Sequence, residues 1–292
     1  MNSTAIILVV ISAFFHATRN LFTKASLDKQ VFLWWYSIFG MLFFLPIFGY
    51  GLSRGRLPST DVIPVIGISG AIHCLYWFFH TRAYEGGDLS RVYPIMRSAP
   101  AVVLLFALLF LHEKVSFAGA VGIGLVAIGI YMINMRHLSA TELILPLRAA
   151  TRDRPTRYAL LTMLSVAAYS IVDKIAVQRT DPLVFAFLHL FVGMLLYTPY
   201  ILYTRGTALI RRVWLSDRRT IMANGLLGIF GYTLILVAFT IENVSYVVGL
   251  RQLSIVFAVV MGGRLLQEEH QTVRLISALI IFAGAFLICV AG

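Results

Sequence analysis

Long runs of apolar residues, separated by short polar breaks, follow one another along the whole of this 292-residue sequence. A helix needs roughly 20 mostly apolar residues to cross the hydrocarbon core of a bilayer, and each run has about that length. The pattern therefore predicts an all-α integral membrane protein with ten transmembrane helices. The predicted spans are residues 4–25, 31–50, 62–84, 89–111, 115–135, 157–178, 183–204, 219–241, 244–266 and 272–291.

The composition leaves no room for a soluble domain. Apolar residues make up 59% of the chain and charged residues only 13%, a balance that a lipid-facing exterior demands. The longest breaks, 136–156 and 205–218, are too short and too basic to fold alone. Cys74 and Cys289 lie inside apolar runs, where we expect small buried hydrophobic residues and no metal site. We expect no cofactor.

The two halves of the chain resemble each other. Residues 83–133 align with 238–288 at a constant offset of 155 residues, with seven identical pairs among 51. Glu113 and Glu268 both follow an apolar run, and Gly129 and Gly284 share a register in the next run. At an offset of 153 residues, the first helix of each half carries polar groups at equivalent depths. The predicted units are residues 1–135 and 157–292, joined by the basic loop 136–156.

Because each predicted unit has five spans, the second must enter the membrane from the opposite side. Inverted repeats of this kind are typical of secondary transporters, whose binding site lies between the halves near the bilayer midplane. The sequence therefore favours a protein that carries a small-molecule substrate across the lipid bilayer.

Particular residues and motifs also carry a resemblance to a known family. They are Ala83-Tyr84-Glu85, Ser90, Pro94, Pro100, Leu111-His112-Glu113-Lys114 and Gly129, then Ser245, Gly249-Leu250-Arg251-Gln252, Leu266-Gln267-Glu268 and Gly284. In these motifs and over essentially its whole length, the chain resembles the drug/metabolite transporter superfamily, and within it the EamA-like ten-helix transporters. The resemblance implies a multi-pass inner-membrane protein, with export the expected direction. It does not indicate the substrate, because members carry amino acids, sugars, nucleotide sugars, phosphorylated intermediates and cations. Gly249 replaces the proline of the first half, so we expect the halves to bend differently.

Three arginines, Arg19, Arg97 and Arg251, lie near the centres of predicted spans. A charge at this depth costs about 2.5–3.5 kcal/mol on insertion scales, so each should face a cavity or a partner. In the repeat, Arg97 aligns with Gln252, which is the neighbour of Arg251. Each half therefore has one guanidinium at a similar depth. A guanidinium pairs well with carboxylate or phosphate, so two facing one chamber favour an anionic or zwitterionic substrate. The alternative is that Arg19 or Arg97 pairs with Asp173 and holds the halves together.

Helical spacing groups further polar side chains. His16, Arg19 and Asn20 share one face of the first span with Thr23, and Tyr169 and Asp173 are stacked in the sixth. His73, Trp77, His80 and Tyr84 follow one face of the third span, with Tyr232 in the repeat position of Trp77. The predicted substrate-binding residues are Arg97, Arg251, Gln252, His16, Arg19, Asn20, Trp77, His80, Tyr169, Tyr232 and Tyr246, with Asp173 as a proton-coupling residue or a structural ion pair.

Other readings remain open for several residues. The protonatable candidates for coupling are His16, His80, Glu85 and Asp173, of which Asp173 is the best placed. His189 is expected to be a satisfied interior group. Glu113 and Glu268 are expected to cap helices. The glycines of the fifth span, Gly119, Gly122, Gly124 and Gly129, indicate close helix packing or a dimer seam.

Other functions fit the sequence less well. Aromatic or quaternary-amine solutes are an alternative substrate class, because the third span offers ring faces. An intramembrane enzyme is a further alternative, but no HExxH pair, Gly-x-Ser-x-Gly elbow or carboxylate dyad occurs. The net charge is +11, and most of the Lys and Arg residues lie in the loops. This placement indicates contact with anionic lipid headgroups and not binding of nucleic acid. We expect a monomer or a homodimer.

The distribution of the basic residues also predicts orientation. Sixteen of the 24 Lys and Arg residues flank the odd-numbered breaks and five flank the even-numbered ones. Short loops rich in Lys and Arg stay in the cytoplasm, which puts both termini outside. The family resemblance implies termini inside, so the two expectations conflict.

Overall fold

Helices account for nearly all of the computed structural model, which describes residues 1–86, 92, 95–132, 153–265 and 271–291. They are α1 (Ser3–Ala25), α2 (Lys29–Ser53), α3 (Ile63–Gly86), α5 (Ala99–Phe110), α6 (Phe117–Met132), α8 (Arg154–Val177), α9 (Pro182–Ile241), α10 (Val244–Leu250), α11 (Leu253–Leu265) and α12 (Gln271–Ala291). No strand occurs in these ranges.

Short polar residues at the breaks explain where several helices begin. The Asp28 carboxylate accepts hydrogen bonds from the backbone of Gln30 (3.0 Å) and Val31 (2.9 Å) at the start of α2. Asp181 accepts from Leu183 at 2.8 Å at the start of α9. Asn2 and Asp153 cap α1 and α8 in the same way. Each cap satisfies amide groups that a helix start leaves without a partner.

Six of the described helical segments are long and apolar enough to cross a membrane. They are Ser3–Asn20, Lys29–Ser53, Ile63–Ala83, Arg154–Val177, Pro182–Ile241 and Val244–Met261. Three shorter apolar helices, Ile95–Phe110, Phe117–Met132 and Leu275–Ala291, accompany them. The chain is therefore a multi-pass membrane protein, and most of the helices overlap the predicted apolar runs to within a few residues.

The structure narrows the predicted break at 205–218 to a kink at Gly206. The rest of this stretch is helical, and α9 consists of two helices on either side of Gly206, which contain the spans predicted at 183–204 and 219–241. Gly206 interrupts α9 with φ 66° and ψ 154°, a conformation that only glycine adopts readily. The basic residues of this stretch thus lie in a helix. A polar composition shows where the chain leaves the lipid, but it does not show where a helix ends.

The fourth element is interrupted in both halves. In the second half, α10 ends at Leu250 and α11 begins at Leu253, so Arg251 and Gln252 form the break in the span predicted at 244–266. In the first half a turn at Ser98 precedes α5. Pro94, Ser90, Leu266 to Glu268 and most of the loop 136–156 lie outside the described residues.

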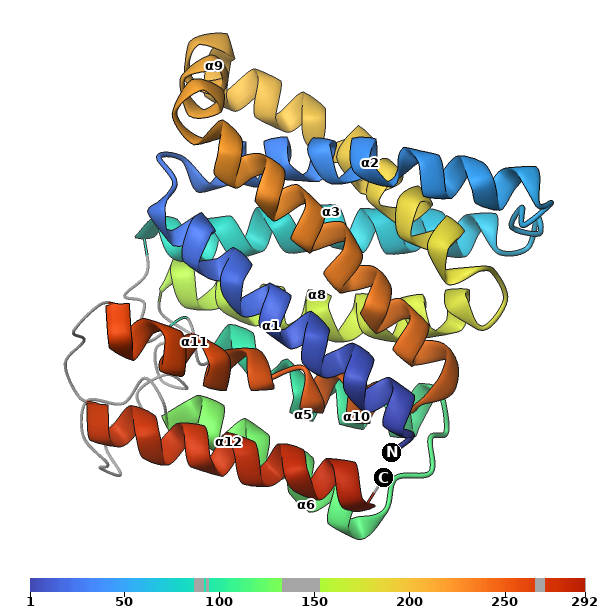
Figure 1. Cartoon of the computed structure of the whole chain (residues 1–292), viewed down its shortest axis with the longest axis vertical. Coiled ribbons are helices and arrows are strands. Elements are labelled where there is room, and N and C mark those ends of the chain that lie inside the picture. The colour runs from blue at the N-terminus through green and yellow to red at the C-terminus, as the bar shows by residue number, and fades with distance from the viewer. Residues whose placement is uncertain (87–91, 93–94, 133–152, 266–270, 292) are drawn as a thin grey trace.

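Helices from the two halves pack against each other in matching ways (Figure 1). α3 packs along α8, while α1 packs along the later part of α9, where Ser12 Oγ donates to Gly231 O at 2.6 Å. α2 lies against both parts of α9, and α6 packs along α12 at the opposite edge. The two termini lie together, since the Met1 amino group donates to Cys289 O at 3.1 Å.

Glycines let α6 and α12 approach closely. A Cβ on Gly122 would lie 2.8 Å from Gly284 O, and one on Gly129 would lie 2.9 Å from Ser277 O. The offset of 155 residues places Gly122 on Ser277 and Gly129 on Gly284, so exchanging the halves reproduces both contacts. Gly119 instead makes room for Tyr246, and Gly124 faces open space. The expected close packing is confirmed for Gly122 and Gly129.

Glu113 has the expected capping role, but it caps a helix of the other half. Its carboxylate accepts hydrogen bonds from Val244 N at 2.7 Å and Ser245 Oγ at 2.8 Å, at the start of α10. The negative charge there complements the positive end of the α10 dipole. The break after α5 is thereby fixed to the start of α10.

Candidate functional site

Two arginines from different halves converge on one histidine of α1. Arg97, just before α5, donates from Nη1 to His16 Nε2 at 3.1 Å. Because a guanidinium only donates, Nε2 must accept and the His16 proton must sit on Nδ1. Arg251 and Arg19 are also close enough for their charges to act on His16. We call His16, Arg19, Arg97 and Arg251 the arginine cluster.

Aromatic rings support two of these guanidinium groups. Arg19 Cζ lies 4.8 Å from the centroid of the Tyr36 ring, and Arg251 Cζ lies 5.5 Å from that of Tyr232. Gly228 makes room for Arg19, since a Cβ there would lie 3.0 Å from Cζ. The Nε atoms of Arg19 and Arg251 are buried without a hydrogen-bond partner. No ion pair in the described part of the chain joins either residue to a carboxylate.

The side chains of the arginine cluster keep some accessible surface. All four are half-buried, as are Tyr36, His80 and Tyr232 beside them. They come from α1, α2, α3, α9 and the broken fourth elements of both halves. Charged groups on so many helices face one another instead of lipid, which is the placement that the cost of intramembrane charge requires.

Asp173 lies deeper, in a second group that we call the Asp173 network: Ser69, His73, Asp173 and Tyr232. Its carboxylate has no accessible surface. Oδ1 accepts from Ser69 Oγ at 2.5 Å, and Oδ2 accepts from the Tyr232 hydroxyl and lies 3.7 Å from His73 Nε2. The network joins α3, α8 and α9. Asp173 therefore does not pair with Arg19, and the predicted structural ion pair with that arginine is wrong.

Stacked rings connect the two groups. His73 stacks on Tyr169 with centroids 4.2 Å apart, and Tyr76 contacts both Tyr169 (5.6 Å) and His80 (5.3 Å). His80 is also near enough to Arg97 to be affected by its charge. The predicted residues His80, Tyr169 and Tyr232 thus lie in a series of ring contacts that links the arginine cluster to the Asp173 network.

Other predicted site residues lie elsewhere. The Tyr246 hydroxyl accepts from Ser116 N at 2.9 Å, and its ring packs on Gly119, which ties α10 to the start of α6. Trp77 faces the first part of α9, against Gly193 and Tyr197.

Two polar residues have less defined roles. Gln252 is buried beside Arg251 and donates to Val248 O at 3.3 Å, while its Oε1 has no partner. The Asn20 side chain is half-buried on α1, and within the described ranges it makes no recorded hydrogen bond. The side chain of Glu85 lies outside the described residues.

Sequence reasoning missed Ser69, Tyr36 and Tyr76. Ser69, His73, Tyr76 and His80 follow positions i, i+4, i+7 and i+11 on α3, which is the inward face. The predicted face shared His73 and His80 but ran through Trp77, which lies about 100° from Tyr76 around the helix. His189 has the expected satisfied nitrogen, with Nδ1 2.9 Å from Phe185 O, but it also contacts the His73 ring at 4.8 Å.

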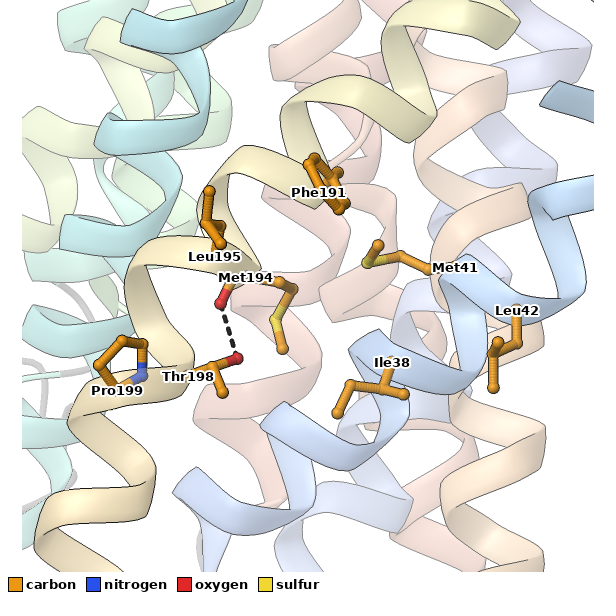
Figure 2. Close-up of a pocket in the computed structure, with 8 residues that line it drawn as sticks. All are labelled: Ile38, Met41, Leu42, Phe191, Met194, Leu195, Thr198 and Pro199. Atoms are coloured by element: carbon orange, nitrogen blue, oxygen red, sulfur yellow. Dashed lines mark hydrogen bonds between the residues drawn. The ribbon is translucent and has the colours of Figure 1, made fainter.

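A groove on the molecule lies apart from the arginine cluster and the Asp173 network. It has a volume of about 380 Å³ and lies between α2 and α9, as Figure 2 shows. Its lining residues are Ile38, Met41, Leu42, Phe191, Met194, Leu195, Thr198 and Pro199. The Thr198 hydroxyl donates to Met194 O at 2.7 Å, so its polar group is satisfied within the helix. The groove thus offers an apolar surface that suits lipid chains and carries no charge for a polar solute.

The fold and the site define a class: a multi-pass helical membrane protein with charged side chains from several helices in its interior. Comparison with known proteins makes the assignment specific. Residues 3–135 and 157–290 match the EamA-like transporter family, so the chain belongs to that family and is a membrane transporter of the drug/metabolite type. The family is one of transporters, which agrees with the expectation that the chain is not an enzyme.

Two relatives add to this result. The uncharacterized protein MJ1333.1 of Methanocaldococcus jannaschii is 27% identical over 138 residues, which are 46% of this chain and 98% of that protein. A solved crystal structure is similar over 100% of this chain and 99% of its own, with a TM-score of 0.75 and 17% identity. This second likeness concerns the fold alone.

Proposed function

We propose that the protein is a secondary transporter that moves a small organic anion or zwitterion, bearing carboxylate or phosphate, across the inner membrane. The observation that carries this proposal is the convergence of Arg97 and Arg251 on His16 and Tyr169. Arg251 has an unpartnered buried Nε and no carboxylate partner among the described residues. A substrate carboxylate or phosphate would supply the acceptors that such a guanidinium lacks.

The transport mechanism we propose is alternating access by ten helices in two inverted halves, residues 1–135 and 157–292, acting as a monomer or homodimer. Two contacts between α6 and α12 support such halves, because each is converted into the other when the halves are exchanged. The protein MJ1333.1 also supports two halves, because 98% of its length matches only 46% of this chain. Inverted halves give inward-open and outward-open states of similar energy. Export is the direction that we propose.

The substrate class can be weighed against cationic solutes. An aromatic cage for a quaternary amine needs open ring faces. In this site Arg19 already lies over Tyr36 and Arg251 over Tyr232. Three arginines also repel a cation, while the interior Asp173 is engaged by Ser69 and Tyr232. The arrangement therefore favours an anion, or a zwitterion bound through its acidic group.

A ligand-stabilisation screen of the purified protein tests this proposal. The panel contains carboxylates, phosphates, aromatic amino acids and quaternary amines, and the wild type is compared with Arg251→Ala and Arg54→Ala. Arg54 is the matched control, an exposed arginine over the Tyr50 ring. We expect carboxylates or phosphates to raise the melting temperature of the wild type and of Arg54→Ala, and not of Arg251→Ala. Stabilisation by quaternary amines alone would refute the anion assignment.

A further inference from the structure

Hydrogen bonding fixes the tautomers of two buried histidines beside Asp173. His73 Nδ1 lies 3.0 Å from Ser69 O, and His189 Nδ1 lies 2.9 Å from Phe185 O. A carbonyl oxygen only accepts, so each Nδ1 carries a proton. In the neutral rings the second nitrogen, Nε2, is then a bare acceptor. For His73 that acceptor lies 3.7 Å from Asp173 Oδ2.

An ionised Asp173 and a neutral His73 would therefore turn lone pairs toward each other. Ser69 and Tyr232 donate to the carboxylate, but no donor comes from His73 in this state. Both side chains are buried, where an uncompensated negative charge is costly. One added proton, on Nε2 or on the carboxyl group, removes both the net charge and the repulsion. We propose that Asp173 and His73 form a shared proton-binding site, with His189 packed beside it.

Tyr232 links this proton site to the arginine cluster. Its hydroxyl donates to Asp173 and its ring lies under the Arg251 guanidinium, 5.5 Å from Cζ. The groups that face the site are Tyr169 of α8, His73 of α3, His189 and Tyr232 of α9, and Arg251 at the α10–α11 break. Arg251 is the fixed positive charge in this set. A positive charge opposes the binding of a proton nearby.

The sign of the coupling follows, and here the inference rests on the proposed function. An anion bound at Arg251 offsets the positive charge and so favours proton binding at Asp173 and His73. By thermodynamic linkage, the bound proton favours the anion by the same factor. A unit charge roughly 10 Å away, at an effective dielectric constant of about 20, changes proton affinity roughly tenfold. Anion and proton therefore cross together, and an anion that accumulates inside the cell leaves with its proton.

The test requires no substrate. Protein labelled with ¹⁵N-histidine, in nanodiscs and in buffers without carboxylate or phosphate, is titrated by NMR, with the His73 signals assigned through His73→Gln. We expect His73 to titrate in the wild type. Arg251→Gln should raise the midpoint by about one pH unit, the roughly tenfold effect above. Arg54→Gln, the exposed matched control, should leave the midpoint unchanged.

A second variant probes the carboxylate itself. Asp173→Asn keeps the shape of the side chain and should abolish the shared titration. If it does not fold, Tyr232→Phe removes one donor from the carboxylate and should raise the midpoint. A His73 signal that is constant with pH, or an unchanged midpoint in Arg251→Gln, would overturn the proton site whatever the protein transports. The expected titrations in a protein that binds no anion would support the proton site and refute the proposed function alone.

Discussion

Two alanine substitutions on α6, only two positions apart, should have opposite effects on stability. A Cβ on Gly122 would lie 2.8 Å from Gly284 O and 3.1 Å from Ile288 N, which are backbone atoms of α12. Normal contacts exceed these distances by roughly 0.5 Å, and overpacking of this kind costs about 1–3 kcal/mol. The gain from replacing a helical glycine by alanine is at most about 1 kcal/mol. Gly122→Ala should therefore have a net loss of up to about 2 kcal/mol, and it should be less stable than a variant that gains the helix propensity without the overlap.

Gly124→Ala is the matched control, because a Cβ there meets nothing within 4 Å. It should be neutral or slightly stabilising, so the two variants should differ in melting temperature by several degrees. Size-exclusion chromatography of the protein after heating in detergent measures this difference. Equal melting temperatures, or a lower one for Gly124→Ala, would show that α6 and α12 do not pack as described.

The same seam gives a test of additivity. A Cβ on Gly284 would lie 2.6 Å from Gly122 O, so Gly284→Ala should be as harmful as Gly122→Ala. Once one alanine has separated the helices, the second has less to displace. The double variant should then lose clearly less than the sum of the two single losses. Full additivity would indicate two independent sites instead of one shared contact.

Three further predictions concern a cap, a kink and the orientation. Glu113→Gln keeps one acceptor for Val244 N and loses the charge, so the melting temperature should fall by an amount equivalent to about 1 kcal/mol; no change would argue against the cap. Gly206→Ala should cost about 1–3 kcal/mol through its positive φ alone, whereas Gly49→Ala, also in open space, should be harmless. A reporter fused after Gly292 should be active only outside the cytoplasm if the basic residues set the orientation. Activity confined to the cytoplasm would show the reverse.

The helices could be predicted because lipid imposes a simple rule on composition. Apolar runs located α1, α2, α3 and α8 to within a few residues of their ends. The helical conformation of residues 207–218 in α9 could not be predicted, because their basic composition resembles that of a loop and the φ of Gly206 is a tertiary property. The break at Arg251 has a similar origin, since the residues themselves do not exclude a helix.

Half of the site could be predicted and half could not. A charge inside an apolar run is conspicuous, so Arg19, Arg97 and Arg251 were found directly from the sequence. The partners of Asp173 were missed because serine and tyrosine are unremarkable in an apolar helix. The sequence could not separate the face of α3 through Trp77 from the face through Ser69 and Tyr76, because a large aromatic ring suits helix packing as well as it suits a site. The contacts of Tyr76 and Tyr169 show which face is inward.

Flux through reconstituted liposomes tests the central claim most directly. Liposomes loaded with the carboxylate or phosphate that stabilises the protein are given the same labelled compound outside, and exchange is timed for the wild type, Arg251→Ala and the control Arg54→Ala. We predict exchange by the wild type and by Arg54→Ala, with at least a tenfold loss in Arg251→Ala, since a lost charged hydrogen bond costs about 1.5–3 kcal/mol. Equal exchange by Arg251→Ala and wild type, with both proteins folded, would contradict an anion site at the arginine cluster.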